Sequence, residues 1–219
     1  MKNKIDKKTL ILTTLVAVLP IIAALIMWDK IPDVVATHWD AHGNVNGTSS
    51  KFIGTIVFPG GMALLTFAMP FLLSIDPKYS NTSSKLRTAV QWFIPAVSLV
   101  CSIITLAAAL GISLPVAKIC ISLIGLLILV IGNYLPKTKQ SYTVGIRVPW
   151  TLNSEDNWNK THRFGGFLWV IGGIIMIFCA FIPYGEIVFV ICLFVITLAP
   201  IVYSYVYYRK HGDKETDSE

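Results

Sequence analysis

Charged side chains are scarce in this sequence and are missing from the middle of every long apolar run. Only 14% of the 219 residues are Asp, Glu, Lys or Arg, against roughly 25% in ordinary soluble domains. A charge at the centre of a membrane helix costs about 2.5–3.5 kcal/mol and usually marks an ion or proton path. Its absence argues against a proton-coupled transporter, and a hydrophobic content of 54% argues against a soluble domain.

Motifs that support chemistry are also missing. The four cysteines lie inside apolar runs, without a CxxC pair or a spacing to histidine that suits zinc, and we expect buried free thiols: Cys101, Cys120, Cys179 and Cys192. The sequence has no nucleophile–base pairing, Gly-rich phosphate loop or paired-carboxylate motif. We therefore expect neither an enzyme nor a cofactor. The formal net charge is +6. The basic residues lie beside apolar runs, where they meet lipid headgroups, so direct nucleic-acid binding is not expected either.

Long apolar runs make up most of the chain. Six of them reach about 20 residues, the length that spans a hydrocarbon core, and they cover approximately residues 9–28, 52–75, 88–110, 114–135, 164–182 and 187–208. The predicted fold class is all-α, a polytopic integral membrane protein with six transmembrane helices. Inside the bundle we expect six polar residues to hydrogen-bond between helices, namely Gln91, Ser98, Ser102, Thr105, Ser122 and Asn133. We expect Gly60-Gly61, Gly165-Gly166 and Gly172-Gly173 to be points of close packing.

The Lys and Arg residues are distributed unevenly between the two sides that six spans define. Fifteen of the 18 lie in the N-terminal head, the second loop, the long fourth loop and the tail, and the opposite side has only Lys30, Lys51 and Lys118. The positive-inside rule then makes both termini and the loop 136–163 cytoplasmic, and the loop 29–51 extracellular. We predict a multi-pass protein of the cell membrane, with a two-helix unit over residues 1–87 and a four-helix unit over residues 88–219.

The outer loop contains His38, Asp40 and His42 at alternating positions. In an extended segment all three would face one way, and two histidines with a carboxylate are a plausible metal set. No third strong ligand follows nearby, so we predict a surface loop fixed by Trp39 and its turns in place of a tight metal site. An alternative is that His38 and His42 respond to pH, and the sequence does not decide between these roles.

The inner loop holds five basic residues together with Trp150 and Trp158. Pro149 disfavours helix at the preceding residue, Asn153 or Ser154 can cap a new helix, and Trp158 and His162 would share its face. One interpretation is a binding surface in which Arg147 holds an anion or carboxylate and the tryptophans are anchors. The alternative is an interfacial segment with tryptophans at headgroup depth and basic residues on lipid phosphate.

Both loops carry sequences that resemble a known family. The inner stretch N-Y-L-P-K, followed by Y-T-V-G-I-R-V-P-W-T-L and W-N-K-T-H-R, is similar to the signature of the SdpI family, in which threonine is more frequent at the position of Val148. The matching positions are Asn133, Gly145, Arg147, Pro149, Trp150, Thr151, Trp158, Thr161, His162 and Arg163. The outer loop resembles the domain that often precedes this family, at Pro32, His38, Trp39, Gly43, Gly47 and Lys51.

The resemblance implies a function as well as a fold. The family's namesake is the immunity protein against the sporulation-delaying toxin. A protein of this kind protects its host from a secreted, membrane-active peptide toxin, and in the namesake system it also holds a cytoplasmic repressor at the membrane. The expected partners are a peptide toxin, a cytoplasmic repressor and membrane lipids, and the matching positions would bind or signal. The alternative is a small transporter or exporter of a hydrophobic peptide or lipid.

Overall fold

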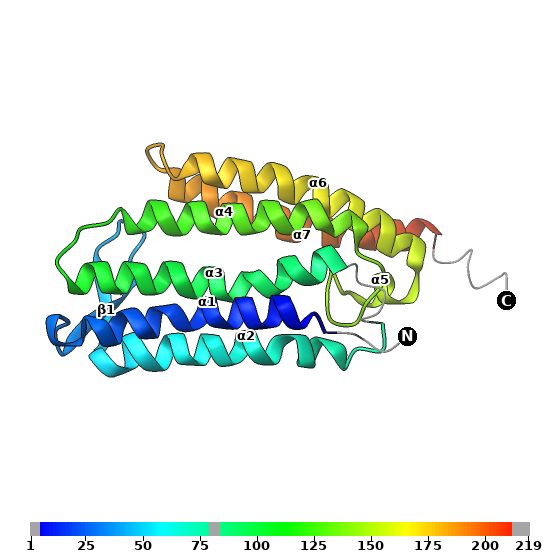
Figure 1. The fold of residues 1–219 in the computed structure, drawn as a ribbon. Coiled ribbons are helices and arrows are strands. Elements are labelled where there is room, and N and C mark those ends of the chain that lie inside the picture. The colour runs from blue at the N-terminus through cyan, green and yellow to red at the C-terminus, as the bar shows by residue number, and fades with distance from the viewer. Residues whose placement is uncertain (1–4, 79–83, 212–219) are drawn as a thin grey trace. The chain divides into compact units, whose positions relative to one another are not determined.

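The chain folds mostly as helix, in agreement with the predicted class (Figure 1). The computed structural model describes residues 5–78 and 84–211. Its α-helices are α1 (Lys7–Ile26), α2 (Phe58–Ser74), α3 (Ser84–Ala109), α4 (Val116–Tyr134), α5 (Pro149–Asn153), α6 (Glu155–Cys179) and α7 (Gly185–His211). A π-helix over Ile53–Val57 leads into α2. Within the described residues, six helical segments are long and apolar enough to cross a membrane, which confirms the predicted six spans. They include every one of these helices except α5.

The fifth span begins much earlier than residue 164, where the apolar run starts. Ser154 is the N-cap of α6, and its Oγ accepts a hydrogen bond of 3.2 Å from the Asn157 amide. Glu155 and Asp156 occupy the first turn, where carboxylates favour the positive end of the helix dipole. The polar residues 155–163 are therefore helical, which confirms the predicted cap at Ser154, and this helix continues without a break into the apolar run that starts at residue 164.

The chain divides into two compact units, and each unit combines segments from both sides of residue 87, where the sequence predicts a boundary. The hairpin unit consists of Lys2–Ser74 and Thr88–Cys120, and the loop unit consists mainly of Ile75–Arg87 and Ile121–Glu219. The boundaries fall at the end of α2, inside α3 and inside α4. A separate two-helix unit over residues 1–87 stays a prediction.

The hairpin unit contains a β-hairpin, which was not predicted from the sequence. Strand β1 (Val34–Trp39) pairs antiparallel with β2 (Val45–Ser50). One side chain of β1, Val35, enters a buried apolar cluster with Ala24, Ile31 and Leu106. A Cβ on Gly54 would lie 2.6 Å from Val35 Cγ2, so only glycine lets the π-helix pack this closely on the strand. Burial of Val35 thus attaches the hairpin to the helices of its own unit.

Helices α1, α2 and α3 of the hairpin unit are joined by the side chain of Gln91. Its Nε2 donates to Thr13 Oγ1 at 3.2 Å and to the Thr66 carbonyl at 2.8 Å. All three residues are buried. The expected role of Gln91 in hydrogen bonding between helices is confirmed, and such bonds stabilise membrane helix pairs where no water competes. For Ser98, Ser102 and Ser122 the same expectation is wrong, because their buried hydroxyls have no hydrogen-bond partner in the described part of the chain.

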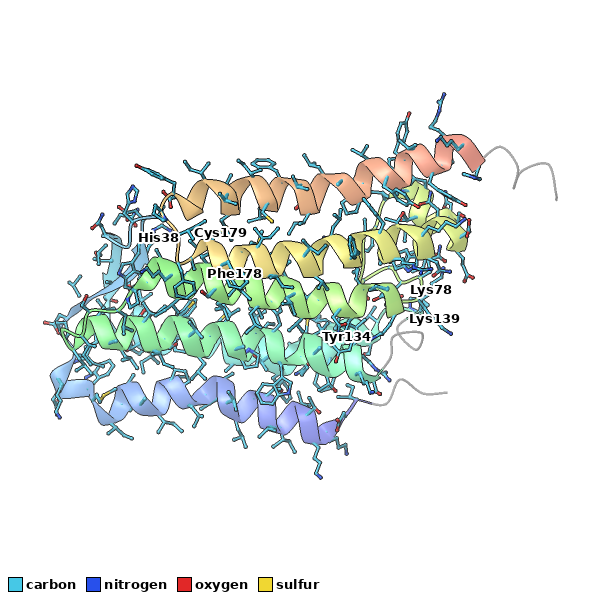
Figure 2. The ribbon with its side chains drawn as sticks, turned by 90° about the horizontal axis from the view of Figure 1, so that it is seen from above. His38, Lys78, Tyr134, Lys139, Phe178 and Cys179 are labelled. Atoms are coloured by element: carbon cyan, nitrogen blue, oxygen red, sulfur yellow. The ribbon has the colours of Figure 1, made fainter. Side chains whose placement is uncertain are left out.

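Helices α4 and α6 of the loop unit approach closely at their glycines. A Cβ on Gly173 would lie 2.6 Å from the Gly125 carbonyl oxygen, and one on Gly166 would lie 2.8 Å from the Gly132 carbonyl oxygen. Small residues at these positions let two backbones meet, which is how membrane helices gain packing without a hydrophobic driving force. The predicted close packing at Gly166 and Gly173 is confirmed, but the same prediction is wrong at Gly61, where nothing would come within 4 Å of a Cβ. Helices α6 and α7 run side by side in the same unit (Figures 1 and 2).

Candidate functional site

A buried aspartate outside the predicted site organises the inner loop. Asp76 follows α2 and is only 4% exposed. Its Oδ2 accepts hydrogen bonds from Ser141 Oγ at 2.7 Å, from the amides of Tyr142 and Thr143 at 3.0 Å each, and from Thr143 Oγ1 at 2.8 Å. Its Oδ1 accepts the Lys78 amide at 2.8 Å. Residues 141–143 therefore form a closed turn around one carboxylate oxygen.

These donors change the acidity of Asp76. Burial raises the pKa of the carboxyl, but the hydrogen bonds from Ser141, Lys78 and Thr143 lower it more strongly, so the pKa lies below its ordinary value. A carboxylate that accepts several N–H and O–H bonds keeps its charge even when it is buried. Asp76 is thus an ionised anchor that is held by backbone amides and hydroxyls.

A second chain of contacts joins the same region to α5. Lys78 Nζ donates to Gln140 Oε1 at 2.6 Å and lies 4.9 Å from the centre of the Tyr142 ring. Gln140 Nε2 in turn donates to the carbonyls of Thr151 and Leu152, at 3.0 and 2.7 Å. Gln140 therefore satisfies carbonyls of α5 that have no partner within so short a helix. Figure 2 shows Lys78 and Lys139 at the same end of the loop unit.

Trp158 and His162 form the buried centre of the inner loop. Both are 0% exposed, and their rings stack with centroids 3.9 Å apart, as the predicted shared face requires. Trp158 Nε1 donates to the Thr138 carbonyl at 2.7 Å. His162 Nε2 accepts the Ile146 amide at 2.9 Å, so the ring is the tautomer whose Nδ1–H donates to the Trp158 carbonyl at 2.8 Å.

Gly145 lies directly against this ring pair. Its φ of +129° is a conformation that side chains with a Cβ rarely adopt. A Cβ there would lie 2.5 Å from His162 Nε2 and 2.6 Å from Trp158 Cη2. The glycine of the G-I-R-V-P-W-T-L stretch is therefore required both by backbone conformation and by lack of space.

Thr151 closes the loop segment onto the start of α5. Its Oγ1 donates to the Ile146 carbonyl at 2.8 Å and accepts the Val148 amide at 3.1 Å. Val148 is extended, with φ −124° and ψ 157°, as predicted from Pro149. Thr151 is 0% exposed, so its hydroxyl is an internal brace.

Ser204 of α7 accepts hydrogen bonds from residues of α5 and α6. Trp150 Nε1 donates to Ser204 Oγ, and Asn157 Nδ2 donates to the Ser204 carbonyl at 3.0 Å. Asn157 Oδ1 accepts the Thr161 hydroxyl at 2.9 Å. The Trp150 ring also packs edge-on against Tyr205, with centroids 5.3 Å apart. The predicted tryptophan anchors thus attach the loop to its own protein.

The predicted inner site therefore separates into three groups. Thr151, Trp158, Thr161 and His162 are buried, Gly145 and Trp150 are partly buried, and Asn133, Arg147, Pro149 and Arg163 are exposed. The guanidinium of Arg147 donates to the Tyr142 carbonyl at 2.5 Å, and binding of an anion or carboxylate by Arg147 stays a prediction. Only the exposed group can meet a partner without rearrangement of the loop.

The predicted outer residues form the hairpin and its turn. His38 Nδ1 lies 2.5 Å from Asn46 Oδ1, and a Cβ on Gly47 would come within 2.8 Å of His38 Cβ. Lys51 Nζ lies 4.3 Å from the centre of the Trp28 ring. Pro32 precedes β1, Trp39 ends it, and Gly43 takes the turn with φ +85°.

Asp40 has a structural partner set of its own. Its Oδ1 accepts the amides of His42 and Asn44 at 2.9 Å each, and these bonds lower its pKa. Within residues 5–78 and 84–211, no group of three or more His, Cys, Asp or Glu side chains is placed to hold a metal ion. Asp40, the carboxylate between the two histidines of the predicted metal set, therefore stabilises the turn of the hairpin.

Sequence reasoning missed Asp76, Gln140, Asn157 and Ser204. Asp76 and Ser141 are 65 positions apart, and no local pattern joins them. The available signal was a lone acidic residue at the end of an apolar run, followed later by the hydroxyl-rich Ser141-Tyr142-Thr143.

Comparison with known proteins supports the resemblance on both loops. The model of the SdpI/YfhL protein family matches residues 137–205, and that of a domain of unknown function, DUF1648, matches residues 15–63. A curated relative, "Immunity protein SdpI" of Bacillus subtilis (strain 168), is 25% identical over 205 residues, which cover 91% of this chain and 96% of that protein. No solved structure matches the chain significantly.

Proposed function

With the resemblance to the SdpI family confirmed, we propose that this multi-pass membrane protein is an immunity protein against a secreted, membrane-active peptide toxin. The observation that carries the proposal is the match to an immunity protein over nearly the whole of both chains. The inner loop adds support, because its buried polar groups form hydrogen bonds with one another. Such a loop suits recognition by its exposed side chains, so the protein would act by binding and not by catalysis.

Expression in toxin-sensitive cells that lack their own immunity protein tests this function. The cells are challenged with the sporulation-delaying toxin and, separately, with culture supernatant of the host species. The Bacillus subtilis relative serves as positive control and the empty vector as negative control. We expect survival above the vector for at least one challenge. Survival equal to the vector for both, at a membrane abundance equal to that of the relative, would refute the immunity function.

We further propose that the exposed part of the inner loop contacts a cytoplasmic partner, such as a repressor. Arg147 and Pro149 are exposed and Tyr142 is 50% exposed, next to the rigid turn around Asp76. Arg147 has further donors beyond the one that it gives to the Tyr142 carbonyl. These donors can bind a carboxylate of the partner in the planar geometry that Lys lacks.

Arg147→Ala and Arg147→Lys are expected to lose signalling to a similar degree while membrane abundance stays near wild type. The removed side chain is exposed, so the loss of stability should be within about 1 kcal/mol. The measurement is expression of the operon that contains the gene, after toxin challenge, alongside abundance. Lys139→Gln, which changes an exposed cation of the same loop, is the matched control. Full signalling by Arg147→Ala at normal abundance would exclude this contact.

The proposed orientation places both termini and the inner loop in the cytoplasm of the cell. In a cysteine-free background, Ser50→Cys should react with an impermeant maleimide added to intact cells, and Lys139→Cys should react only after lysis. Both positions are exposed, whereas Ser141 is 0% exposed and would resist labelling on either side. Labelling of Lys139→Cys from outside, without labelling of Ser50→Cys, would reverse the orientation.

A further inference from the structure

Helices α6 and α7 form a pocket that includes Arg163 and that the proposed contacts at Arg147 do not involve. It has a volume of about 340 Å³ and is lined by Lys160, Arg163, Phe164, Phe167 and Tyr203. Four of these residues come from one face of α6, because positions 160, 163, 164 and 167 follow helical spacing. The cations lie toward the N-terminal end of that face and the phenylalanines toward its apolar part.

Arg163 is the available cation of the pocket. It is exposed and makes no hydrogen bond or ion pair with any residue in the described part of the chain. Lys160 differs, because its Nζ lies 3.1 Å from Asp156 Oδ2 and donates to Tyr207 Oη at 2.6 Å. An ammonium has three N–H donors, so Lys160 keeps one for a ligand while its charge is already balanced by Asp156.

The apolar wall of the pocket begins where the polar part of α6 ends. Phe164 stacks on Tyr203 with centroids 4.6 Å apart, which fixes its ring between the two helices. Phe167 is 64% exposed. One helical turn separates Arg163 from Phe167, a rise of about 6 Å. The headgroup region on each side of a bilayer is roughly 5–8 Å thick, so Arg163 and Phe167 are spaced to meet a phosphate and an upper acyl chain.

We propose that this pocket binds an anionic phospholipid, with its phosphate on Arg163 and the remaining Lys160 donor, and its acyl chain along Phe164 and Phe167. A guanidinium fork matches phosphate oxygens, and the phenylalanines would gain nothing from a free anion. The pocket lies beside the helix that carries Trp158 and His162, so the bound lipid would contact the helix that supports the inner loop. The proposal does not depend on whether the protein confers immunity.

The test measures lipids that the purified, full-length protein retains. Native mass spectrometry follows titration with phosphatidylglycerol and with phosphatidylcholine of the same acyl chains. We expect a preference for phosphatidylglycerol that falls about fivefold in Arg163→Gln and is also weakened in Phe167→Ala. Matched controls are Lys139→Gln, a cation outside the pocket, and Phe178→Ala, a 68% exposed phenylalanine at the far end of α6 (Figure 2). Both should retain lipid as wild type does.

Several outcomes would overturn the proposal. If Arg163→Gln and Lys139→Gln reduced the preference for phosphatidylglycerol equally, the anionic lipid would be attracted to the overall positive charge of the protein and not to this pocket. If Arg163→Gln did not reduce that preference, the pocket would not be the lipid site. Inorganic phosphate that displaces phosphatidylglycerol at millimolar concentration, with Phe167→Ala unchanged, would assign the pocket to a free anion. If Arg163→Gln does not fold, the test rests on lipid retention by Phe167→Ala compared with Phe178→Ala. Both removed rings are exposed, so neither substitution should prevent folding. Equal lipid retention by these two variants then overturns the proposal.

Discussion

Asp76→Ala is expected to destabilise the loop unit by about 3 kcal/mol or more, because it leaves the buried donors of residues 141–143 without their acceptor. Four hydrogen bonds end on its Oδ2 alone. Asp76→Asn keeps one oxygen but loses the charge, so its loss should be smaller. Thermal unfolding in detergent and membrane abundance measure both variants. Asp33→Ala is the control, since the exposed side chain of Asp33 makes no hydrogen bond or ion pair in the described part of the chain.

The contribution of Asp76 should also depend on pH in a defined direction. The pKa of Asp76 in the folded protein lies below its ordinary value. Its stabilising contribution is therefore complete above the unfolded pKa and is lost as pH falls through the folded pKa. The stability difference between wild type and Asp76→Asn should be constant down to about pH 5 and should narrow below about pH 4. A difference that grows on acidification would contradict the ionised anchor.

Gly145→Ala is the second substitution with a large expected effect, about 2–6 kcal/mol of lost stability. Backbone strain at positive φ contributes about 1–3 kcal/mol, and overpacking against His162 and Trp158 contributes about 1–3 kcal/mol more. Both rings are fully buried and hydrogen-bonded, so neither can move aside easily. The measurement is again the unfolding temperature in detergent.

Gly61→Ala is the matched control for Gly145→Ala. Gly61 lies in α2, and nothing would come within 4 Å of a Cβ there. Alanine inside a helix is favoured over glycine by about 0.5–1 kcal/mol, so Gly61→Ala should be neutral or stabilising. If the two glycine substitutions had equal effects, the close approach of Gly145 to the ring pair would be disproved.

The elements that could be predicted from the sequence are those with a local cause. Apolar runs must become helices because a bilayer offers no other partner for the backbone. The pairing of Trp158 with His162 and the extended Val148 follow from helical spacing and from Pro149. Close packing at Gly166 and Gly173 follows from the need of membrane helices for small residues.

The features that could not be predicted depend on contacts between distant residues. The carboxylate of Asp76 meets Ser141 across 65 positions, and Trp150 meets Ser204 across 54. The β-hairpin escaped prediction because β2 reads V-N-G-T-S-S, which has no apolar alternation, and only Val35 of β1 is buried. The candidate site residues were predicted from the family resemblance, and burial decides which of their side chains are accessible to a partner.

Hydrogen exchange of the inner loop tests most directly that residues 141–163 form a rigid scaffold around Asp76 and His162. The amides of Tyr142 and Thr143 donate to Asp76 Oδ2, and the amide of Ile146 donates to His162 Nε2. In the intact protein these amides should exchange at least about 100-fold more slowly than in an unstructured peptide. In Asp76→Asn the protection of Tyr142 and Thr143 should fall sharply. Exchange at the unstructured rate in the wild-type protein would contradict the scaffold.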